Sequence, residues 1–179
     1  MQSVQHILDA ALYAAQKHAS QKRKGRSAEP YINHLIEVAQ LVSAALPEPD
    51  ANLVMAALLH DTIEDTGVTA AELLEHFGQD VADLVVEMTD DKSLPKAERK
   101  RLQIEHAPNM TVRAQIIKLA DKISNFRSII SSPPPDWDYE RKKQYFEWGK
   151  SVVDALSQPN PILKAEFEKT YRRFDEVRA

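Results

Sequence analysis

The octet "LLHDTIED" (residues 58–65) marks the point at which an apolar helical segment turns acidic. On a continuous helix, residues four apart are stacked neighbours, so His60 would lie over Glu64. The same spacing stacks Asp61 over Asp65, which places two like charges one turn apart and costs helix stability. The octet therefore indicates either a nearby cation that offsets the carboxylates or a solvated acidic helix end, and it does not decide between them.

Helical periodicity extends in both directions from this octet. The octet belongs to a predicted helix over residues 51–65, which is apolar on almost every side before His60 and is therefore expected to be central and buried. Asp50 is placed to cap this helix, and "TAAE" (69–72) has the form of a capping box whose short helix ends at Gly78. Apolar residues at helical spacing predict further helices over about residues 3–19, 32–45, 80–88, 95–107, 112–131, 138–156 and 162–177.

These elements predict an all-α protein, a compact helical bundle with short connections. No stretch of useful length shows the alternation of a strand, and the chain has no repeats or low-complexity tracts. We interpret residues 1–179 as a single domain, because this length suits one sizeable hydrophobic core.

The composition limits the kinds of partner. The chain has a formal net charge of −4 and no cysteine, so we expect no nucleic-acid partner, no disulfide and no thiolate metal site. A metal ion would be held by imidazole and carboxylate groups, which favours manganese, iron, magnesium or a zinc site with hard ligands. The N-terminal segment does not read as a signal peptide, and no apolar run approaches membrane-spanning length, so we expect a cytoplasmic protein without membrane contact.

Two of the six histidines lie within apolar helical segments, His34 in "PYINHLIEVAQLV" and His60 in "MAALLHD". A buried histidine needs a partner for each ring nitrogen, which a backbone carbonyl or a shared metal ion can supply. Asp121 lies away from the main apolar stripe of its helix, so periodicity alone predicts a solvated residue paired with Lys118 or Lys122. The remaining histidines are interpreted as solvated or helix-terminal: His6, His18, His76 and His106.

Five separated motifs resemble those of the RelA/SpoT-type alarmone hydrolases of the HD superfamily: "EPYINH", "ALLHDTIEDT", "TDDKSLPKAERKR", "KLADKISNFR" and "YFEW". Their order and spacing are similar over about residues 5–155, and HDxxED followed by LADKxxNxR is a highly specific combination. The chain looks most similar to the stand-alone small alarmone hydrolases, the group that includes the metazoan SpoT homologue. The resemblance implies an HD-type fold and hydrolysis of guanosine 3′,5′-bis(diphosphate), which releases the 3′-pyrophosphate and leaves GDP, or GTP from the pentaphosphate.

The resemblance also implies roles for individual residues. It implies that Glu64 and Asp65 orient or deprotonate the attacking water. It implies one divalent metal ion per chain, typically Mn²⁺, with four ligands: His34, His60, Asp61 and Asp121. The positions that match the nucleotide pocket are Arg23, Lys24, Asn125, Arg127 and Tyr145.

A diphosphate substrate carries several negative charges, so cations must compensate them. We expect Lys96 to contribute, although "KAERKR" also reads as an ordinary exposed helix face. The other candidate cations are Arg23, Lys24, Lys92, Arg99 and Lys100. The segment "SQKRKGRSAEP" (20–30) breaks the helical pattern with charge, Gly25 and Pro30, and is predicted to be a basic loop. Many bifunctional members of the resembled family continue this basic loop into Ser-Gly-Glu-Pro. Here "RKGRSAEP" is two residues longer before Pro30, so either Ser27 replaces that serine or no residue does.

Two alternatives to alarmone hydrolysis are kept. A phosphatase that acts on another nucleotide would use the same metal and water. Its substrate would be NADPH, from which it removes the 2′-phosphate, or an adenosine alarmone. A nucleotide-binding HD module without catalysis would have lost a metal ligand or a member of the acidic pair, and this sequence retains all six. The sequence does not define the oligomeric state.

Overall fold

The computed structural model describes residues 4–48 and 50–177, and it confirms the predicted all-α class. Residue 3, where the first helix was predicted to begin, lies outside these residues. Extended pairing within the described part is limited to a bridge between Lys22 and Pro30. The elements are α1 (Val4–Lys17), α2 (Ile32–Ala44), α3 (Ala51–Leu59), α4 (Thr62–Thr66), α5 (Ala70–Phe77), α6 (Gln79–Met88), α7 (Lys96–His106), η1 (Ala107–Asn109), α8 (Val112–Ser131), α9 (Tyr139–Ala155), α10 (Pro161–Arg172) and η2 (Arg173–Val177).

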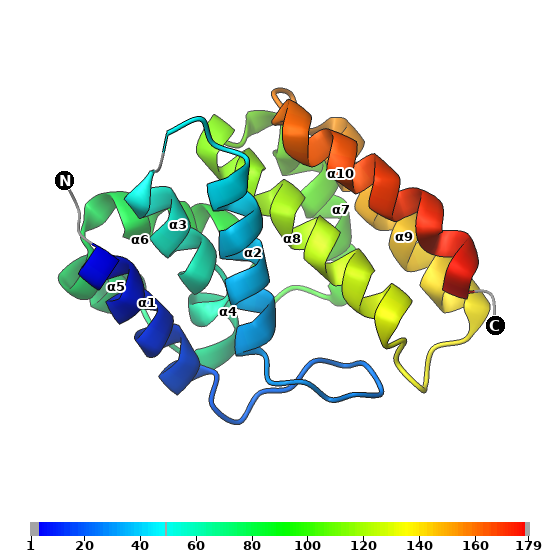
Figure 1. Cartoon of the computed structure of the whole chain (residues 1–179), viewed down its shortest axis with the longest axis horizontal. Helices are drawn as coiled ribbons and strands as arrows, with labels where there is room; N and C mark the ends of the chain where they lie inside the picture. Colours follow the sequence, from blue (N-terminus) through cyan, green and yellow to red (C-terminus); the bar gives the residue numbers. More distant parts are fainter. Residues whose placement is uncertain (1–3, 49, 178–179) are drawn as a thin grey trace.

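Helix α8 is the element around which the others are arranged (Figure 1). It is bordered by α2 and by α9 and α10, and it also contacts α3 and α6. Every residue of α8 from 114 to 124 is buried, polar side chains included. Asp121 is therefore only 8% exposed, and the prediction of a solvated residue from periodicity is wrong. The physical reason is that helices pack against both faces of α8, so the apolar stripe does not mark its only buried face.

Helix α3 is enclosed in the same way, as its composition predicts. Every residue from 53 to 59 is buried, with α1, α2 and α6 packed around them. The predicted cap is present, because the Asp50 carboxylate accepts the backbone N–H of Leu53 at 3.0 Å. The capping box of Thr69 and Glu72 also opens α5 as predicted, with both of its hydrogen bonds made.

The predicted continuous helix over residues 51–65 is wrong, because the structure interrupts it at His60 and Asp61. Helix α3 ends at Leu59 and α4 begins at Thr62. Asp61 has φ −101° and ψ −1°, in the bridge region where many active-site residues lie. Neighbouring side chains on an unbroken helix do not face one another. The interruption removes that restriction and turns both side chains toward the same point.

The loop of residues 18–31 between α1 and α2 is docked onto the end of α8. Gly25 lies so close to Ser132 that an added Cβ would overlap the Ser132 carbonyl oxygen. The backbone N–H of Ser27 donates to Ser132 Oγ at 2.9 Å, and the two hydroxyls are 3.0 Å apart. The loop turns at Ala28, which adopts a positive φ of 47°. The loop therefore has a fixed path past the end of α8.

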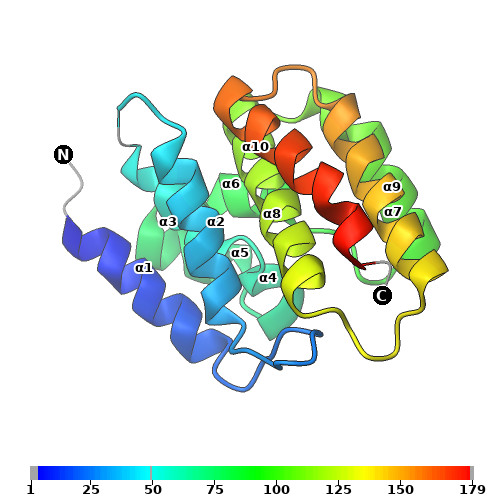
Figure 2. The same ribbon diagram turned by 45° about the vertical axis from the view of Figure 1, so that its right-hand side comes forward.

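Aromatic rings join α8 to the two C-terminal helices, and Figure 2 shows α10 lying across α8 beside α9. Phe126, Phe146 and Phe167 are fully buried. The ring of Phe126 stacks on Phe146 at 4.0 Å between centroids and lies 5.3 Å from Phe167. Gly149 of α9 allows this approach, because a Cβ there would lie 2.6 Å from a ring carbon of Phe126.

We predict that Gly149→Ala destabilises the protein. Replacing a helix-interior glycine by alanine normally stabilises a solvated helix by about 1 kcal/mol. Here the added methyl would overlap Phe126, and overpacking of this kind typically costs about 1–3 kcal/mol. Urea denaturation should therefore show a lower free energy of unfolding. Ser151→Ala, on the exposed face of the same helix, should change it by less than about 0.5 kcal/mol. A Gly149→Ala variant more stable than the wild type would contradict the packing described.

Candidate metal centre and nucleotide cavity

Two imidazoles and two carboxylates converge where α2, α8 and the break between α3 and α4 meet. His34 Nε2 lies 3.3 Å from Asp121 Oδ1 and 3.7 Å from Asp61 Oδ2. His60 Nε2 lies 3.2 Å from Asp61 Oδ2 and 3.8 Å from Asp121 Oδ1. Ligand atoms of His34, His60 and Asp121 all lie within 4.8 Å of one another. The structure thus brings together the four side chains for which metal binding was predicted.

The hydrogen bonds of the two imidazoles leave one nitrogen of each ring free. His60 Nδ1–H donates to the carbonyl oxygen of Ala57 at 2.8 Å, and His34 Nδ1–H donates to Ser124 Oγ at 2.8 Å. Both side chains are only 2% exposed, yet neither Nε2 has a hydrogen-bond partner among the described residues. Buried polar atoms are normally satisfied, and a neutral imidazole whose Nδ1–H is fixed presents Nε2 as a ligand. The donor set therefore fits a divalent metal ion.

The electrostatics of the cluster also favour a cation. Burial disfavours the charged form of His60, but Asp61 and Asp121 outweigh burial and raise its pKa to about 10, so without a metal ion this ring carries a second proton, on Nε2, which a bound cation would replace. Burial lowers the pKa of His34, which keeps that ring neutral. Burial opposes ionisation of Asp61, but His60 outweighs it and holds the pKa of this carboxyl well below its usual range. Two ionised carboxylates in a buried site call for positive charge, which a divalent ion would supply.

Tyr31 is a further member of the cluster that the sequence analysis did not single out. Its hydroxyl donates to Asp61 Oδ2 at 2.7 Å, and its ring stacks on His18 at 5.2 Å. His18, interpreted as solvated or helix-terminal, directly follows α1 but is only 2% exposed, and its Nδ1 lies 2.6 Å from Gln21 Oε1, so it is helix-terminal and not solvated. Both residues flank the basic loop, whose ends are joined by a bond from the Tyr31 N–H to the Gln21 carbonyl oxygen at 3.0 Å, and Tyr31 is half-buried. Tyr31 lies within the quoted motif "EPYINH", but no spacing pattern distinguishes it from its neighbours.

The two acids of α4 lie beside the cluster and are each held by named partners. Glu64 accepts the backbone N–H of Asp90 at 3.2 Å, and Arg99 lies 3.6 Å from its other oxygen. Burial raises the pKa of Glu64, with smaller contributions from the charges of Asp90 and Asp61. A raised pKa suits a carboxylate that exchanges protons near neutral pH. The acid is therefore electrostatically suited to work as a base.

Asp65 points toward the basic side of the site. It accepts a hydrogen bond from Gln21 Nε2 at 2.8 Å and makes a short ion pair with Lys92. These contacts link α4 to the basic loop and to the segment before α7. The Asp65 carboxylate is therefore paired with a cation, which offsets the repulsion between Asp61 and Asp65 that the octet LLHDTIED predicts.

A cavity of about 500 Å³ opens from this cluster and is lined by both acidic and basic side chains. Its walls include residues of the cluster and the acid pair: His60, Asp61, Glu64, Asp65 and Asp121. They also include cations and aromatic rings: Arg23, Lys24, Lys92, Lys96, Arg99, Lys100, Lys118, Tyr31, Trp137, Tyr145 and Trp148. Such an arrangement can bind a metal ion and a polyanion with an aromatic base side by side.

The predicted nucleotide-pocket residues divide into two groups by position. Five of the six line the 500 Å³ cavity: Arg23, Lys24, Lys96, Asn125 and Tyr145. Arg23 Nη1 donates to Asn125 Oδ1 at 3.1 Å, and Asn125 Nδ2 donates to Asp121 Oδ1 at 2.6 Å. The basic loop is thereby connected to the metal cluster through one amide.

Arg127 is the residue that the structure does not bring to this cavity. Its guanidinium pairs with Glu37 at 2.9 Å and with Glu166 at 2.8 Å. It lines a separate hollow of about 160 Å³ between α2 and α8. Two residues on from Asn125, Arg127 projects from another face of α8, and two carboxylates hold it there. This placement differs from the expectation that it lines the nucleotide pocket. Ser27 is likewise absent from the cavity wall, since it bonds to Ser132.

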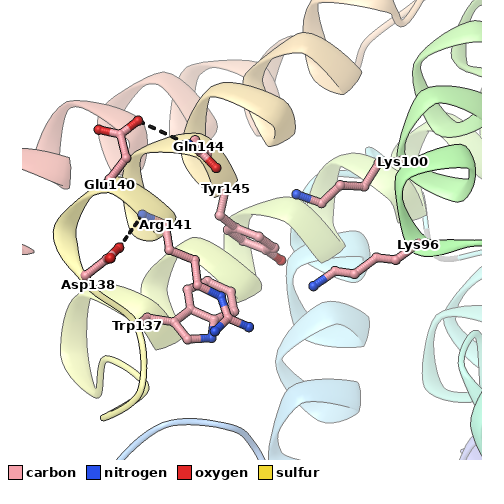
Figure 3. Close-up of a pocket in the computed structure, with 8 residues that line it drawn as sticks. All are labelled: Lys96, Lys100, Trp137, Asp138, Glu140, Arg141, Gln144 and Tyr145. Carbon is pink, nitrogen blue, oxygen red and sulfur yellow. Dashed lines mark hydrogen bonds between the residues drawn. The ribbon is translucent and has the colours of Figure 1, made fainter.

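A second pocket of about 420 Å³ adjoins the cavity and shares four wall residues with it, Lys96, Lys100, Trp137 and Tyr145. Figure 3 shows Lys96 and Lys100 reaching from α7 toward the rings of Trp137 and Tyr145. Arg141 completes the basic wall, with its guanidinium 4.7 Å from the Trp137 ring centre. Burial and neighbouring cations lower the pKa values of Lys96 and Lys100. Cations that repel one another across a pocket are suited to bind an anion.

Two buried lysines of α8 were also missed. Lys122 Nζ lies 3.1 Å from Asp121 Oδ2 and donates to Gln103 Oε1 at 3.1 Å. Lys118 Nζ lies 3.5 Å from the carbonyl oxygen of Met88 and reaches the cavity wall. From the sequence, such a pair was expected only for a solvated Asp121. The pairing with Lys122 exists, but it lies in the interior because α8 is enclosed.

A family model described as an HD domain matches residues 10–145, so the chain belongs to the HD-domain family. It is 47% identical over 165 residues to the Xenopus tropicalis protein named guanosine-3′,5′-bis(diphosphate) 3′-pyrophosphohydrolase MESH1, with 92% of each chain covered. The human protein of the same name is 44% identical over 167 residues, with 93% of each chain covered. A solved structure described as a metazoan ortholog of SpoT that hydrolyzes ppGpp has a TM-score of 0.91 and 43% identity over 97% of each chain. The resemblance read from the five motifs is confirmed.

A membrane-crossing helix, long and apolar enough for a bilayer, does not occur within residues 4–48 and 50–177.

We predict that Mn²⁺ stabilises the wild-type protein and that His60→Ala removes this effect. Mn²⁺ at about 100 times its dissociation constant should add about 2.7 kcal/mol to the free energy of unfolding, because the ion binds the folded state. His60→Ala removes one of the two free Nε2 atoms. Urea denaturation with and without Mn²⁺ measures the difference. His106→Ala, which changes an exposed histidine at the end of α7, is the matched control and should respond like the wild type. Equal stabilisation of the His60→Ala variant would contradict this site.

Proposed function

We propose that this chain is a metal-dependent hydrolase that removes the 3′-pyrophosphate from the alarmones ppGpp and pppGpp, giving GDP and GTP. The observation that carries the proposal is that one cavity is lined by residues of the metal-binding cluster, by an acid of raised pKa and by several cations. The names of relatives that are 44–47% identical over nearly the whole chain support the same reaction. We propose that residues 1–179 act as one HD-type domain.

We propose His34, His60, Asp61 and Asp121 as the metal ligands and Mn²⁺ as the ion, since imidazole and carboxylate ligands suit it. A divalent ion bound there would supply a water of lowered pKa and would polarise an oxygen of the phosphoryl group whose phosphorus is attacked. The remaining work falls to side chains of this chain. Tyr31 and Asn125 hold the two carboxylates through hydrogen bonds of 2.7 and 2.6 Å.

Glu64 is proposed as the base that accepts the proton of the attacking water. Its raised pKa and its fixed position between the Asp90 N–H and Arg99 support this role. As the water oxygen bonds to phosphorus, the bond from phosphorus to the 3′ oxygen breaks. Pyrophosphate is released, and the 3′ oxygen takes up a proton to become the 3′-hydroxyl of GDP or GTP, which balances the proton taken by Glu64. We propose that Asp65 orients the reactants by holding Lys92, which faces the same cavity, toward the departing phosphates.

The rest of the nucleotide is proposed to lie against the cations and aromatic rings of the cavity wall. Arg23, Lys24, Asn125 and Tyr145 would hold the nucleoside, and the aromatic ring provides a surface on which a base stacks. The 5′-phosphates would enter the adjoining pocket between Lys96, Lys100 and Arg141 (Figure 3). This division gives each of the two phosphate chains of the substrate its own cations. We propose that the substrate is a free nucleotide in the cytoplasm, and that the chain binds neither nucleic acid nor a membrane.

Another phosphorylated nucleotide, such as NADPH or an adenosine alarmone, is less favoured because the relatives are named for guanosine-3′,5′-bis(diphosphate). The decisive assay supplies Mn²⁺ and compares ppGpp, pppGpp, an adenosine alarmone and NADPH, measuring released phosphate and pyrophosphate separately. We expect pyrophosphate from the guanosine alarmones and no turnover after metal is stripped by a chelator. Normal alarmone hydrolysis by the chelator-treated protein would contradict the metal-dependent mechanism. Undetectable turnover of every nucleotide, together with tight binding of one, would favour a non-catalytic nucleotide-binding module.

Glu64→Gln is the matched variant for this assay. It should lower kcat for ppGpp by at least about 100-fold, because the amide cannot accept the proton, while Mn²⁺ affinity stays unchanged. Glu75→Gln, an exposed acid of α5, should have no effect. A Glu64→Gln variant with wild-type kcat would show that another group accepts the proton.

We predict that Arg141→Gln weakens substrate binding without slowing the chemical step. A hydrogen bond to a charged group contributes about 1.5–3 kcal/mol, so KM should rise about 10-fold or more while kcat stays within about twofold. Steady-state kinetics with ppGpp and pppGpp measure both quantities. Lys143→Gln removes the same charge from the same helix outside the pocket wall, and its KM should match the wild type. A lowered kcat at unchanged KM would place Arg141 at the reacting phosphate instead.

A further inference from the structure

A line of polar contacts leads from the metal-binding cluster to the C-terminal helix. His34 Nδ1 lies 2.8 Å from Ser124 Oγ, and Ser124 Oγ lies 2.6 Å from Glu37 Oε2. The other oxygen of Glu37 accepts Arg127 Nη1–H at 2.9 Å, and Arg127 Nη2–H donates to Glu166 Oε1 at 2.8 Å. The line joins α2, α8 and α10 at the place where Figure 2 shows α8 between the other two helices.

The direction of the hydrogen bonds in this line is determined by its charged end. Glu37 is paired with Arg127 and is therefore a carboxylate, which can only accept. Ser124 has one proton and must donate it to Glu37, so its oxygen accepts from His34. His34 then carries its proton on Nδ1, and its Nε2 lone pair faces Asp61 and Asp121.

The two imidazoles of the cluster are thus supported in different ways. His60 donates to the backbone carbonyl of Ala57 in the last turn of α3, a contact that no substitution of a neighbouring side chain removes. His34 depends on a hydroxyl that is 1% exposed and whose orientation depends in turn on Glu37. The two intermediate residues, Glu37 and Ser124, each lie one helical turn after a cluster residue, His34 on α2 and Asp121 on α8.

We propose that Ser124, Glu37 and Arg127 are positioning residues that hold His34 ready to bind metal through Nε2, and that Glu166 makes α10 part of this support. The inference rests on the metal site of the proposed function, but it concerns metal affinity and not the substrate. It gives Arg127 of the LADKxxNxR motif a place in the structure that the nucleotide cavity does not offer. It also gives α10 a function other than covering the aromatic core.

The test measures Mn²⁺ affinity of the whole chain by competition with a chelating dye, without substrate. Ser124→Ala leaves the buried Nδ1–H of His34 without an acceptor, and loss of such a contact typically weakens metal binding about 10–100-fold. Ser124→Thr, which keeps the hydroxyl, should recover most of the affinity. Glu37→Gln should weaken binding less than Ser124→Ala, and Arg127→Met and Glu166→Gln should have progressively smaller effects.

A double variant separates positioning from general destabilisation. Once Ser124 is alanine, Glu37→Gln should cause no further loss of Mn²⁺ affinity, because the link between them is already broken. Lys169→Ala and Ser151→Ala are the controls: Lys169 contacts Glu166 from the exposed side at 3.6 Å, and Ser151 lies on α9. Both should bind Mn²⁺ like the wild type. Urea denaturation of the metal-free proteins verifies that each variant is folded.

The outcomes for this proposal and for the reaction can be told apart. Wild-type Mn²⁺ affinity in both Ser124→Ala and Glu37→Gln would overturn the inference, even if the chain hydrolyses alarmones. Weakened affinity in both variants would support it, even if the wild type releases no pyrophosphate from any nucleotide. If Ser124→Ala fails to fold, Glu37→Gln, whose side chain is 34% exposed, carries the test alone.

Discussion

The interruption of the helix at His60 and Asp61 is the constraint on which the site depends. Adjacent residues on a regular helix point in different directions, so one ion cannot normally be held by both. Ending α3 at Leu59 and restarting at Thr62 brings the two side chains to within 3.2 Å of each other. The enclosed helix before the break anchors His60 in the core, and the short helix after it carries the acid pair away toward the cations. The break in the helix thus places the proposed metal ligands, His60 and Asp61, apart from the acid pair of α4, which is proposed to act on the water and the reactants.

Helix α8 supplies the matching half of the site and is its structural centre. One face presents Asp121 and Asn125 to the cavity, another holds Ser124 and Arg127 against α2 and α10, and a third packs Phe126 into the aromatic core. Because these faces belong to a single rigid helix, a shift of its packing would move the ligand and its supports together. The aromatic core and the metal cluster are therefore parts of the same packing arrangement.

Much of the fold could be predicted from the sequence, and the limits have physical causes. Capping residues and apolar spacing located most helices, because those signals act within one or two turns. Periodicity failed for Asp121, because enclosure by distant helices decides its burial. The helix break at Asp61 and the placement of Arg127 on Glu37 and Glu166 also depend on tertiary contacts. The metal cluster was predictable only as a resemblance, since spacing along the chain does not show that helices meet.

The docking of the basic loop onto Ser132 determines where the loop can tolerate added residues. The chain closes the loop by a bridge between Lys22 and Pro30 and by a turn at Ala28, where φ is positive. The turn at Ala28 lies beyond the close contact of Gly25 with Ser132. Arg23 comes before that contact and donates to Asn125. Residues added at the turn would therefore lengthen the loop without displacing the Arg23 guanidinium from Asn125.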